Sequence, residues 1–255
     1  MGSVRYGQHF LISDAIVEKE LEYASLTKND VVLEVGPGKG KLTFPLAERV
    51  KEVIAVEVDS YLIKSLEPTL PENVTLIQGD IVKTDLESLP RFNKVVSNLP
   101  YQVSSPFTFQ LLEYDFELAV LIYQLDFALR MVAEPWEYDY SRLSVGVYYK
   151  AECEIVEEIP RTCFQPAPRV DSAMVVLKPR EQAPFELESE AFFYELAREL
   201  FSHRRKMIRS ILKNRYNVTD DDLPFMEMRV EEMSAEEIGL LANWLVKRGV
   251  NKGGE

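Results

Sequence analysis

The sequence predicts an α/β fold with a mostly parallel sheet, followed by a small helical domain. Two observations support this prediction. Short apolar runs alternate with helix-length segments over the first two-thirds of the chain, and only helical spacing of apolar residues follows residue 189. Nearly continuous apolar runs are typical of parallel strands that are covered on both faces. The alternation therefore predicts a sheet with helices on both sides.

Five apolar runs are expected to form the parallel part of the sheet. They occupy residues 31–35, 52–58, 74–80, 94–100 and 117–124. Helices are expected near residues 40–49, 60–68, 105–113 and 125–133. Two longer β runs follow, over residues 144–159 and 172–179. No helix-length segment separates these two runs, so we expect them to pair antiparallel.

The last third of the chain is expected to be helical. Residues 179–188 carry two prolines and mixed charge and are interpreted as a linker. Apolar residues then fall at helical spacing over 189–213 and again over 234–248. We therefore expect an α/β domain over residues 1–180 and a helical domain over residues 181–255.

Composition places the chain among ordinary globular proteins. Its 255 residues are 46% hydrophobic and 28% charged, which argues against disorder. No apolar run approaches the ~18 residues of a membrane span, and the first residues are not typical of a signal peptide. The cysteines, Cys153 and Cys163, are too few for a disulfide framework and lack metal-ligand spacing. We expect a cytoplasmic protein without a metal.

Charge is distributed unevenly along the chain. The net charge of −13 argues against nucleic-acid binding, yet residues 198–215 are strongly basic. Their cations are Arg198, Arg204, Arg205, Lys206, Arg209, Lys213 and Arg215, against the single acid Glu199. The ordinary interpretation of such a run is a solvated helix face. On so acidic a chain we favour RNA docking instead, through a patch on the first tail helix. The residues expected to dock are Arg204, Arg205, Lys206 and Arg209.

A glycine-rich turn follows the first strand, over residues 34–40 (EVGPGKG). Glycines there let a ligand approach the backbone closely. The turn does not match the dinucleotide pattern G-x-G-x-x-G, because Lys41 stands five residues after Gly36. The alternative is a plain tight turn. We favour a ligand site that includes Gly36 and Gly38.

Acidic residues end the next two strands. Glu57 lies 21 residues after Gly36, where a carboxylate can accept hydrogen bonds from ribose hydroxyls. Asp59 is the rival candidate, and a solvated carboxylate is the alternative for either. Asp80, followed by Ile81, ends the third strand and can accept from an adenine amino group, although it could instead be a helix cap. Together with the glycine-rich turn, these acids indicate a nucleoside ligand.

The fourth strand ends in Asn98-Leu99-Pro100-Tyr101. This tetrapeptide resembles the (D/N/S)-(P/L)-P-(Y/F) motif of methyltransferases that act on exocyclic or amide nitrogen. Asn98 offers a side-chain acceptor, and Leu99 and Pro100 offer backbone carbonyls to an adenine N6 amino group. Pro100 also fixes the turn, and Tyr101 can stack on a base, a contact worth about 1–3 kcal/mol. A proline turn that merely closes the strand is the less favoured alternative.

Three further stretches complete a resemblance that covers almost the whole chain. They are GQHFL (7–11), FQPAPRVDS (164–172) and FSHRRKMIRSIL (201–212). The sequence resembles the ribosomal RNA adenine N6,N6-dimethyltransferase family of the KsgA/Dim1 type, and most closely its archaeal or eukaryotic branch. The resemblance implies a Rossmann-like class I methyltransferase fold. Its sheet would have seven mostly parallel strands with an antiparallel last strand, and a small helical domain would follow.

The resemblance also implies a cofactor, S-adenosylmethionine, and roles for individual residues. Gln8, His9 and Leu11 would line its methionine end, and Gly36 and its neighbours, including Gly38, its carboxylate and ribose region. Glu57 would bind the ribose, and Asp80 and Ile81 the cofactor adenine. Asn98, with Leu99 or Pro100, would hold the target N6. Tyr101 and Phe164 would enclose the flipped target adenine.

The implied reaction is dimethylation of N6 of two adjacent adenosines in the 3′-terminal hairpin of small-subunit ribosomal RNA. The implied partner is that RNA within a pre-ribosomal particle, and we expect a monomeric enzyme with a role in ribosome biogenesis. One departure is Leu125, which replaces a lysine common in the family and puts one RNA contact in doubt. Two alternatives stay open: a non-catalytic RNA-binding assembly factor, and methylation of DNA adenine or of a protein glutamine amide.

Overall fold

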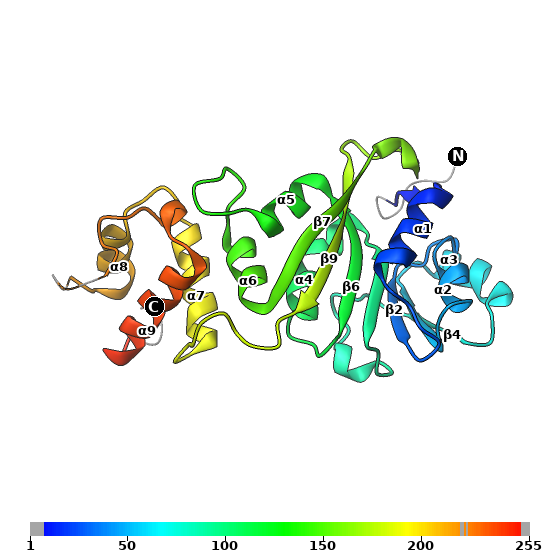
Figure 1. The fold of residues 1–255 in the computed structure, drawn as a ribbon, viewed down its shortest axis with the longest axis horizontal. Coiled ribbons are helices and arrows are strands. Elements are labelled where there is room, and N and C mark those ends of the chain that lie inside the picture. Colours follow the sequence, from blue (N-terminus) through cyan, green and yellow to red (C-terminus); the bar gives the residue numbers. More distant parts are fainter. Residues whose placement is uncertain (1–7, 220–221, 223, 251–255) are drawn as a thin grey trace. The chain divides into compact units, whose positions relative to one another are not determined.

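The computed structural model describes residues 8–219, 222 and 224–250 (Figure 1). Gly7, the first residue of the GQHFL motif, lies outside this range. The chain divides into two compact units. The first comprises the described residues of Met1–Ala128 and Glu152–Pro179, and the second those of Leu129–Ala151 and Arg180–Glu255. No helix within the described residues is long and apolar enough to cross a membrane.

The first unit is built on a seven-stranded sheet. Its strands are β2 (Val31–Val35), β3 (Glu52–Glu57), β4 (Val74–Gln78), β5 (Lys94–Asn98), β6 (Leu118–Gln124), β7 (Ala151–Ile159) and β9 (Ser172–Pro179). They lie in the order β4-β3-β2-β5-β6-β9-β7. The pairs from β4 to β6 are parallel, whereas β6 and β9 are antiparallel. The arrows of β7 and β9 also run in opposite directions in Figure 1. The predicted mostly parallel sheet with a final antiparallel strand is thus confirmed.

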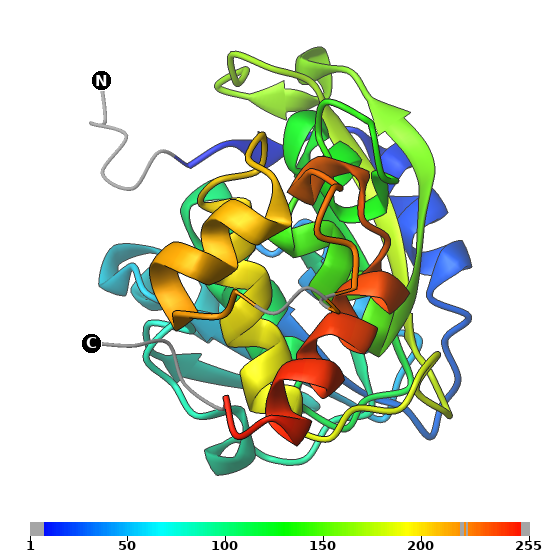
Figure 2. The same cartoon turned by 90° about the vertical axis from the view of Figure 1, so that its left-hand side faces the viewer.

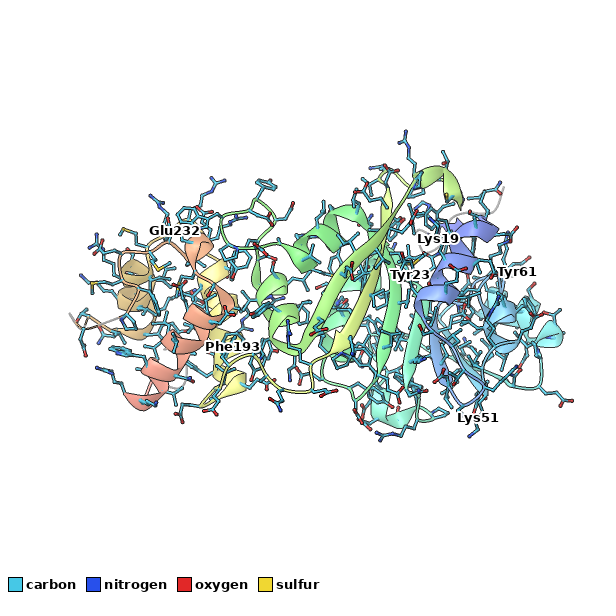
Figure 3. All side chains as sticks on the ribbon, in the orientation of Figure 1. Lys19, Tyr23, Lys51, Tyr61, Phe193 and Glu232 are labelled. Atoms are coloured by element: carbon cyan, nitrogen blue, oxygen red, sulfur yellow. The ribbon has the colours of Figure 1, made fainter. Side chains whose placement is uncertain are left out.

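Helices cover this sheet and leave its carboxyl edge accessible. They are α1 (Asp14–Tyr23), α2 (Thr43–Ala47), α3 (Ser60–Leu66) and α4 (Ser104–Leu111), while α5 (Leu125–Val132) follows β6 and has residues in both units. Helix α1 is attached to β7 through two residues one turn apart, which Figure 3 labels. Lys19 Nζ lies 2.7 Å from Glu157 Oε1, and the Tyr23 hydroxyl donates to the Val156 carbonyl at 3.5 Å.

Short elements complete the two units. The 3₁₀ turns are η1 (Glu67–Thr69), η2 (Leu86–Ser88), η3 (Tyr101–Val103), η4 (Arg161–Cys163) and η5 (Val230–Glu232). A two-residue strand β1 (Phe10–Leu11) pairs antiparallel with β8 (Phe164–Gln165). Strands this short carry no periodic signal, so the sequence did not predict the pair. It brings two motif stretches that are far apart in the sequence side by side.

The second unit is helical, but it includes a segment that the predicted boundary at residue 180 left out. Its helices are α6 (Arg142–Lys150), α7 (Glu190–Phe201), α8 (Ile208–Tyr216) and α9 (Ala235–Lys247) (Figure 2). Tyr140, Val145 and Tyr149 share one buried apolar cluster with residues of α7, α8 and α9. Residues 129–151 therefore belong with the tail, because their apolar side chains complete its core.

The β run expected over residues 144–159 is wrong for its first half. Residues 144–150 lie in helix α6, and only Ala151–Ile159 forms a strand. The helix begins after Ser141, whose backbone N–H donates to the Ser144 hydroxyl at 3.0 Å. Residues Leu143–Val147 are all buried, so the helix has no polar face over its first turns. Without that contrast the pattern of apolar residues resembles a buried strand.

The single helix expected over residues 189–213 is interrupted. Helix α7 ends at Phe201, and α8 begins at Ile208. In the intervening turn the carbonyls of Arg204 and Lys206 accept backbone hydrogen bonds from Glu231 and Val230, at 3.0 and 3.3 Å. These hydrogen bonds come from a segment distant in the sequence, and they replace the bonds that a continuous helix would make within itself. Arg204, Arg205 and Lys206 thus lie in a turn and not on a helix.

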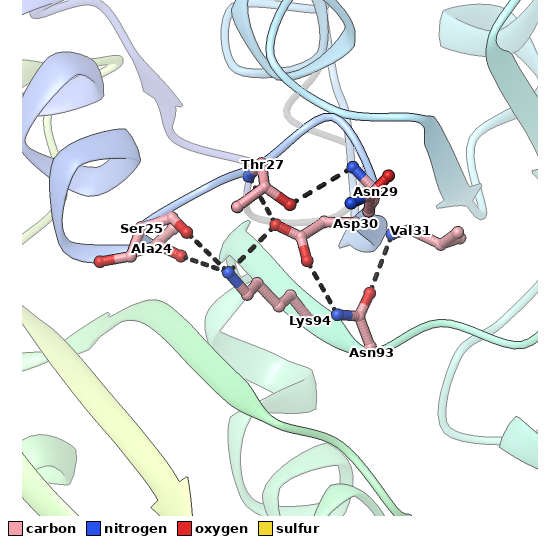
Figure 4. Close-up of polar contacts among 8 residues, drawn as sticks. All are labelled: Ala24, Ser25, Thr27, Asn29, Asp30, Val31, Asn93 and Lys94. Carbon is pink, nitrogen blue, oxygen red and sulfur yellow. Dashed lines mark hydrogen bonds and ion pairs between the residues drawn. The ribbon is translucent and has the colours of Figure 1, made fainter.

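A buried ion pair joins α1 to the amino ends of β2 and β5 (Figure 4). Lys94 Nζ lies 3.1 Å from Asp30 Oδ2 and also donates to the carbonyls of Ala24 and Ser25. Asp30 accepts further hydrogen bonds from the Thr27 backbone and from Asn93 Nδ2. Because every charged group here is paired or hydrogen-bonded, the burial of the lysine is tolerated.

Candidate active site

A pocket of about 770 Å³ lies in the first unit, at the carboxyl ends of β2, β3, β4 and β5. Its volume is typical of a small-molecule site. The residues predicted to bind cofactor or target line it, with one exception. Those lining it are Gln8, His9, Leu11, Gly36, Gly38, Glu57, Asp80, Ile81, Asn98, Leu99, Pro100 and Tyr101. The structure thus brings together segments spread over residues 8–101 of the sequence.

The strand order explains why a pocket forms at this edge. The order reverses between β2 and β5, and in open α/β sheets ligands bind at such a switch point. The paired residues of β2 and β5 end at Leu33 and Val95. Beyond them the buried Ser97 hydroxyl accepts from the Val35 backbone N–H at 3.2 Å and donates to the Val35 carbonyl at 2.7 Å. The Ser97 side chain thus supplies the hydrogen bonds that the two backbones no longer make with each other. The ends of β2 and β5 therefore stay connected although the strands separate there.

The glycine-rich turn needs glycine at two predicted positions. Gly36 and Gly38 have φ angles of +71° and +59°, which side-chain-bearing residues rarely adopt. A Cβ atom on Gly36 would lie 3.1 Å from the Pro100 ring, and one on Gly38 would lie 3.1 Å from the Phe10 ring. The turn is therefore packed closely against both the Asn98–Tyr101 segment and the amino-terminal motif.

Glu57, and not its rival Asp59, faces the pocket. Its side chain is 4% exposed and accepts hydrogen bonds from the Asp59 N–H at 2.9 Å and the Gly38 N–H at 3.3 Å. Burial raises the pKa of Glu57, while the two N–H groups fix the orientation of its carboxyl group. Asp59 instead caps helix α3 by accepting from the Tyr61 N–H.

Asp80 caps the turn that follows it and also lines the pocket, so its role toward an adenine stays a prediction. Its Oδ1 accepts from the Val82 N–H at 3.2 Å, which is a capping contact, and its Oδ2 lies 3.4 Å from Lys83 Nζ. It also lines the pocket beside the buried Ile81.

The Asn98–Tyr101 segment presents two acceptors. Asn98 Nδ2 donates to the His9 carbonyl at 3.5 Å, so its Oδ1 is the atom left to accept. The Pro100 carbonyl already accepts from the Val103 N–H at 3.0 Å. Of the two backbone carbonyls predicted for the target amine, the Leu99 carbonyl is therefore the one without an intramolecular donor among the described residues.

Tyr101 is held from two sides. Its hydroxyl lies 2.8 Å from the hydroxyl of Ser172, the first residue of β9. Its ring centroid lies 5.6 Å from that of His9, at an interplanar angle of 31°. His9 Nδ1 lies 2.7 Å from the Pro166 carbonyl, which fixes the imidazole in turn.

Phe164 is the exception among the predicted pocket residues. It is 3% exposed, belongs to the apolar cluster beneath the sheet, and does not line the pocket. The neighbouring Gln165 lines it instead. Alternation along strand β8 accounts for this arrangement, since adjacent residues point to opposite sides. A stacking role for Phe164 would require its side chain to leave the core.

Two buried carboxyl groups near the site were not predicted as functional residues. Glu34 on β2 lines the pocket and is 2% exposed. Burial raises its pKa to about 8, and the neighbouring Glu57 adds to the rise. Glu20 on α1 is fully buried, and burial together with the nearby Glu34 raises its pKa well above the usual value. Neither oxygen of Glu20 has a hydrogen-bond partner among the described residues. Glu34 stood within the EVGPGKG motif, but nothing in the sequence marked Glu20.

The four residues predicted to dock RNA differ in their surroundings in the second unit. Arg204 donates to the carbonyls of Tyr138 and Glu137 and pairs with Glu231, so its guanidinium is engaged. Arg209 pairs with Glu227 at 2.7 Å.

The other two docking candidates, Arg205 and Lys206, are exposed. Their side chains make no hydrogen bond or ion pair with any other residue that the structure describes. The docking roles of all four residues stay predictions.

Comparison with known proteins gives a consistent result. Residues 2–247 match the profile of the family described as "Ribosomal RNA adenine dimethylase". A "Probable ribosomal RNA small subunit methyltransferase A" of Methanothermobacter thermautotrophicus is 48% identical over 87% of this chain and 79% of its own. A protein of the same name from Methanosarcina acetivorans is 44% identical over 94% of this chain and 92% of its own.

Solved structures extend the similarity to the fold. A dimethyladenosine transferase from Plasmodium falciparum superposes with a TM-score of 0.82 at 28% identity, covering 94% of this chain and 98% of that one. The 23S rRNA methyltransferase ErmE superposes with a TM-score of 0.70 at 26% identity, covering 91% of this chain and 98% of that one.

Proposed function

This chain belongs to the ribosomal RNA adenine dimethylase family, and we propose that it dimethylates N6 of two adjacent adenosines in the 3′-terminal hairpin of small-subunit ribosomal RNA. The fold is that of a class I methyltransferase, and the enzyme depends on S-adenosylmethionine. The position of the target adenosines, and the role of each pocket residue, belong to the proposal.

The pocket residues fit the cofactor. The Glu57 carboxylate is oriented by two backbone N–H groups, and each of its oxygens keeps a lone pair for a ribose hydroxyl. Gly36 and Gly38 have positive φ angles and no Cβ, so the turn can pack against Pro100 and Phe10 and form one wall of the pocket. Gln8, His9 and Leu11 would enclose the methionine end, and Asp80 and Ile81 the adenine. When bound, S-adenosylmethionine supplies a methyl group carried on a positively charged sulfonium.

The target amine is held by Asn98 Oδ1 and the Leu99 carbonyl. The observation that carries this assignment is the hydrogen bond from Asn98 Nδ2 to the His9 carbonyl, because it leaves Oδ1 as the free acceptor. Two acceptors match the two hydrogens of an unmethylated N6. They draw the nitrogen toward tetrahedral geometry and localise its lone pair, which is otherwise delocalised into the ring. Positioning of this kind can supply up to about 7–11 kcal/mol of the barrier reduction.

Tyr101 provides the stacking surface for the flipped adenine. Removing a base from its stack costs a few kcal/mol, and stacking on an aromatic ring returns about 1–3 kcal/mol. The contacts of Tyr101 with Ser172 and His9 hold the ring in place before the base arrives. In the second methylation N6 has one hydrogen left, so one acceptor suffices and the other must tolerate the first methyl group.

The wider setting is also part of the proposal. The enzyme would act as a monomer in the cytoplasm on RNA within a pre-ribosomal particle, and the second unit would dock that RNA through Arg205 and Lys206. The presence of two free cysteines is consistent with a reducing compartment.

The test is methyl transfer from labelled S-adenosylmethionine to unmethylated small subunits and, in parallel, to naked RNA. Mass spectrometry of nuclease fragments would identify the product. We expect two dimethyladenosines per subunit in the 3′-terminal hairpin. Monomethyladenosine as the end product, or transfer to DNA or protein instead, would refute the proposed reaction. Tight binding to subunits with no transfer would indicate a non-catalytic assembly factor.

A further inference from the structure

Two large aromatic side chains project from one loop of the second unit, between α5 and α6. Trp136 is 71% exposed and Tyr138 is 83% exposed. Single exposed apolar residues are common on protein surfaces and need no explanation. A tryptophan and a tyrosine two positions apart, both largely in water, each expose apolar surface that the fold itself does not use.

The loop that carries these rings is fixed on both sides. Arg204 Nη1 donates to the Tyr138 carbonyl at 2.6 Å, and Nη2 donates to the Glu137 carbonyl at 3.2 Å. The Trp136 N–H donates to the Glu231 carbonyl at 2.8 Å, and Glu231 pairs with Arg204. The backbone between the two rings is therefore held, and the rings are presented to solvent from a fixed support.

Trp136 also has a strained backbone. Its φ angle is +75°, in a region that bulky residues rarely occupy and that glycine adopts without cost. Strain of this kind persists where the surrounding structure enforces it, and it is concentrated at functional positions. A tryptophan at a position suited to glycine is unexplained by packing, because most of its side chain contacts nothing.

Unpaired cations lie next to this loop. Arg205 and Lys206 directly follow Arg204, and neither side chain has a partner among the described residues. Glu231, on η5, pairs with Arg204. The acids of the loop itself are Glu134, Glu137 and Asp139, and the hydrogen bond that Glu137 Oε2 accepts from the backbone N–H of Glu134 does not neutralise its charge. These three carboxylates would repel phosphates from the rings themselves. The charges thus favour bases at the rings and phosphates at Arg205 and Lys206.

We propose that Trp136 and Tyr138 form a stacking platform for unpaired bases of RNA, with Arg205 and Lys206 contacting the adjacent phosphates. Aromatic rings beside a cationic groove are the usual means of binding single-stranded nucleic acid. The proposal rests on the proposed function in taking RNA as the partner. It goes beyond that function by assigning a second contact, outside the methylation pocket, to single-stranded RNA.

Tryptophan fluorescence tests the platform without any methyl transfer. The chain has only two tryptophans, Trp136 and Trp244, so W244F leaves Trp136 as the single reporter. The full-length variant would be titrated, without cofactor, with single-stranded oligoadenylate and with an RNA duplex of equal length. We expect oligoadenylate to quench Trp136 at the concentrations at which anisotropy of the labelled RNA reports binding. The duplex, whose bases are unavailable for stacking, should quench it weakly.

Variants separate the rings from the cations. W136A/Y138A should weaken single-strand binding by about 5- to 100-fold without changing its salt dependence. W136F/Y138F, which keeps both rings, should restore most of the affinity. R205A/K206A should weaken binding and flatten its salt dependence. L240A, which removes another exposed apolar side chain of this unit, is the control and should bind normally.

Trp136 should also show opposite effects on stability and binding. W136G should relieve the backbone strain and raise the melting temperature by about 2–4 °C while lowering affinity for the single strand. RNA binding without quenching of Trp136, or full affinity in W136A/Y138A, would overturn the proposal. If W136A/Y138A binds naked RNA normally and loses affinity only for assembled particles, the platform contacts a protein instead. A failure of methyl transfer alone would leave these binding results unaffected.

Discussion

The Tyr101 hydroxyl lies 2.8 Å from the Ser172 hydroxyl. This contact joins the turn after β5 to the first residue of β9, and Ser172 is completely buried. Tyr101 therefore enters the pocket with its far end anchored to the sheet. Burial raises the pKa of Tyr101, so the phenol stays neutral and hydrogen-bonded throughout the physiological pH range.

We predict that S172A lowers kcat by about tenfold while cofactor affinity is unchanged. The variant leaves the Tyr101 hydroxyl without its partner and lets the ring move before the target base arrives. Y101F should have a similar effect, and the double variant should be little worse than either single variant, because both remove the same contact. Single-turnover methylation and cofactor titration measure the two quantities. S88A, which changes an exposed serine outside the pocket, serves as control.

If the losses in kcat caused by S172A and Y101F add in the double variant, the two hydroxyl groups do not act through one contact.

N98A should lower kcat by at least about 100-fold, because it removes one of the two acceptors that hold the target amine. Cofactor affinity should change little, since Glu57 and the glycine-rich turn are untouched. N98D keeps an acceptor but loses the donor to the His9 carbonyl, so it should retain more activity than N98A. Equal turnover by N98A and the unaltered enzyme would exclude this role for Asn98.

The pocket could be predicted from the sequence because parallel strands deliver their carboxyl ends to one edge. Glu57 and Asn98 end a strand, and Gly36 and Asp80 follow one closely, so their strand-end positions alone placed them together. The site depended on local signals of this kind. Ser172 was within a recognised motif, but its contact with Tyr101 spans 71 residues and left no trace in the spacing.

The places where the structure departs from the expected arrangement share a physical cause, which is that long-range contacts replaced local preferences. The start of α6 lacks a polar face because residues Leu143–Val147 are all buried in the structure. The sequence of residues 202–207 is compatible with a continued helix, but backbone N–H groups of Val230 and Glu231 donate to carbonyls of this segment instead. Phe164 faces the core because β8 pairs with β1. None of these partners could be identified from spacing along the chain.

D30N should lower the free energy of unfolding by about 3–5 kcal/mol at pH 7. It leaves the ammonium group of Lys94, whose side chain is 9% exposed, without its counter-charge. Burial alone would raise the pKa of Asp30, but hydrogen bonds from Asn93 and Thr27 and the contact with Lys94 hold it below its usual value.

The pH dependence of this effect has a defined sign. A carboxylate with a lowered pKa contributes stability above its unfolded pKa of about 3.9 and loses it as the pH falls through the folded value. The gap between D30N and the unaltered protein should therefore narrow below about pH 4. Urea unfolding at neutral and acidic pH measures the gap. D115N, which breaks the exposed pair with Arg91, should have little effect at either pH. If D30N lowers the free energy of unfolding as little as D115N does, the buried pair of Asp30 and Lys94 is not stabilising.

E20Q should stabilise the protein, and increasingly so at alkaline pH. Burial raises the pKa of Glu20, as it raises that of Glu34 to about 8. Unfolding exposes both carboxyl groups to water, where each ionises near its usual pKa. The unfolded chain thus binds fewer protons, and the free energy of unfolding falls as the pH rises from about 5 through the folded pKa values. Each such group contributes up to about 1.4 kcal/mol per pH unit to this fall.

Glutamine cannot ionise, so E20Q should remove the contribution of Glu20 to that fall, while the raised pKa of Glu34, which is set by burial and by Glu57, should remain. The measurement is urea unfolding of both proteins at several pH values between 6 and 9. E22Q, which changes an exposed carboxylate two residues along α1, is the matched control and should follow the unaltered protein. Parallel curves for E20Q and the unaltered protein would mean that Glu20 does not stay protonated in the folded state. A reduced slope with unchanged cofactor affinity would show that this buried acid costs stability without contributing to cofactor binding.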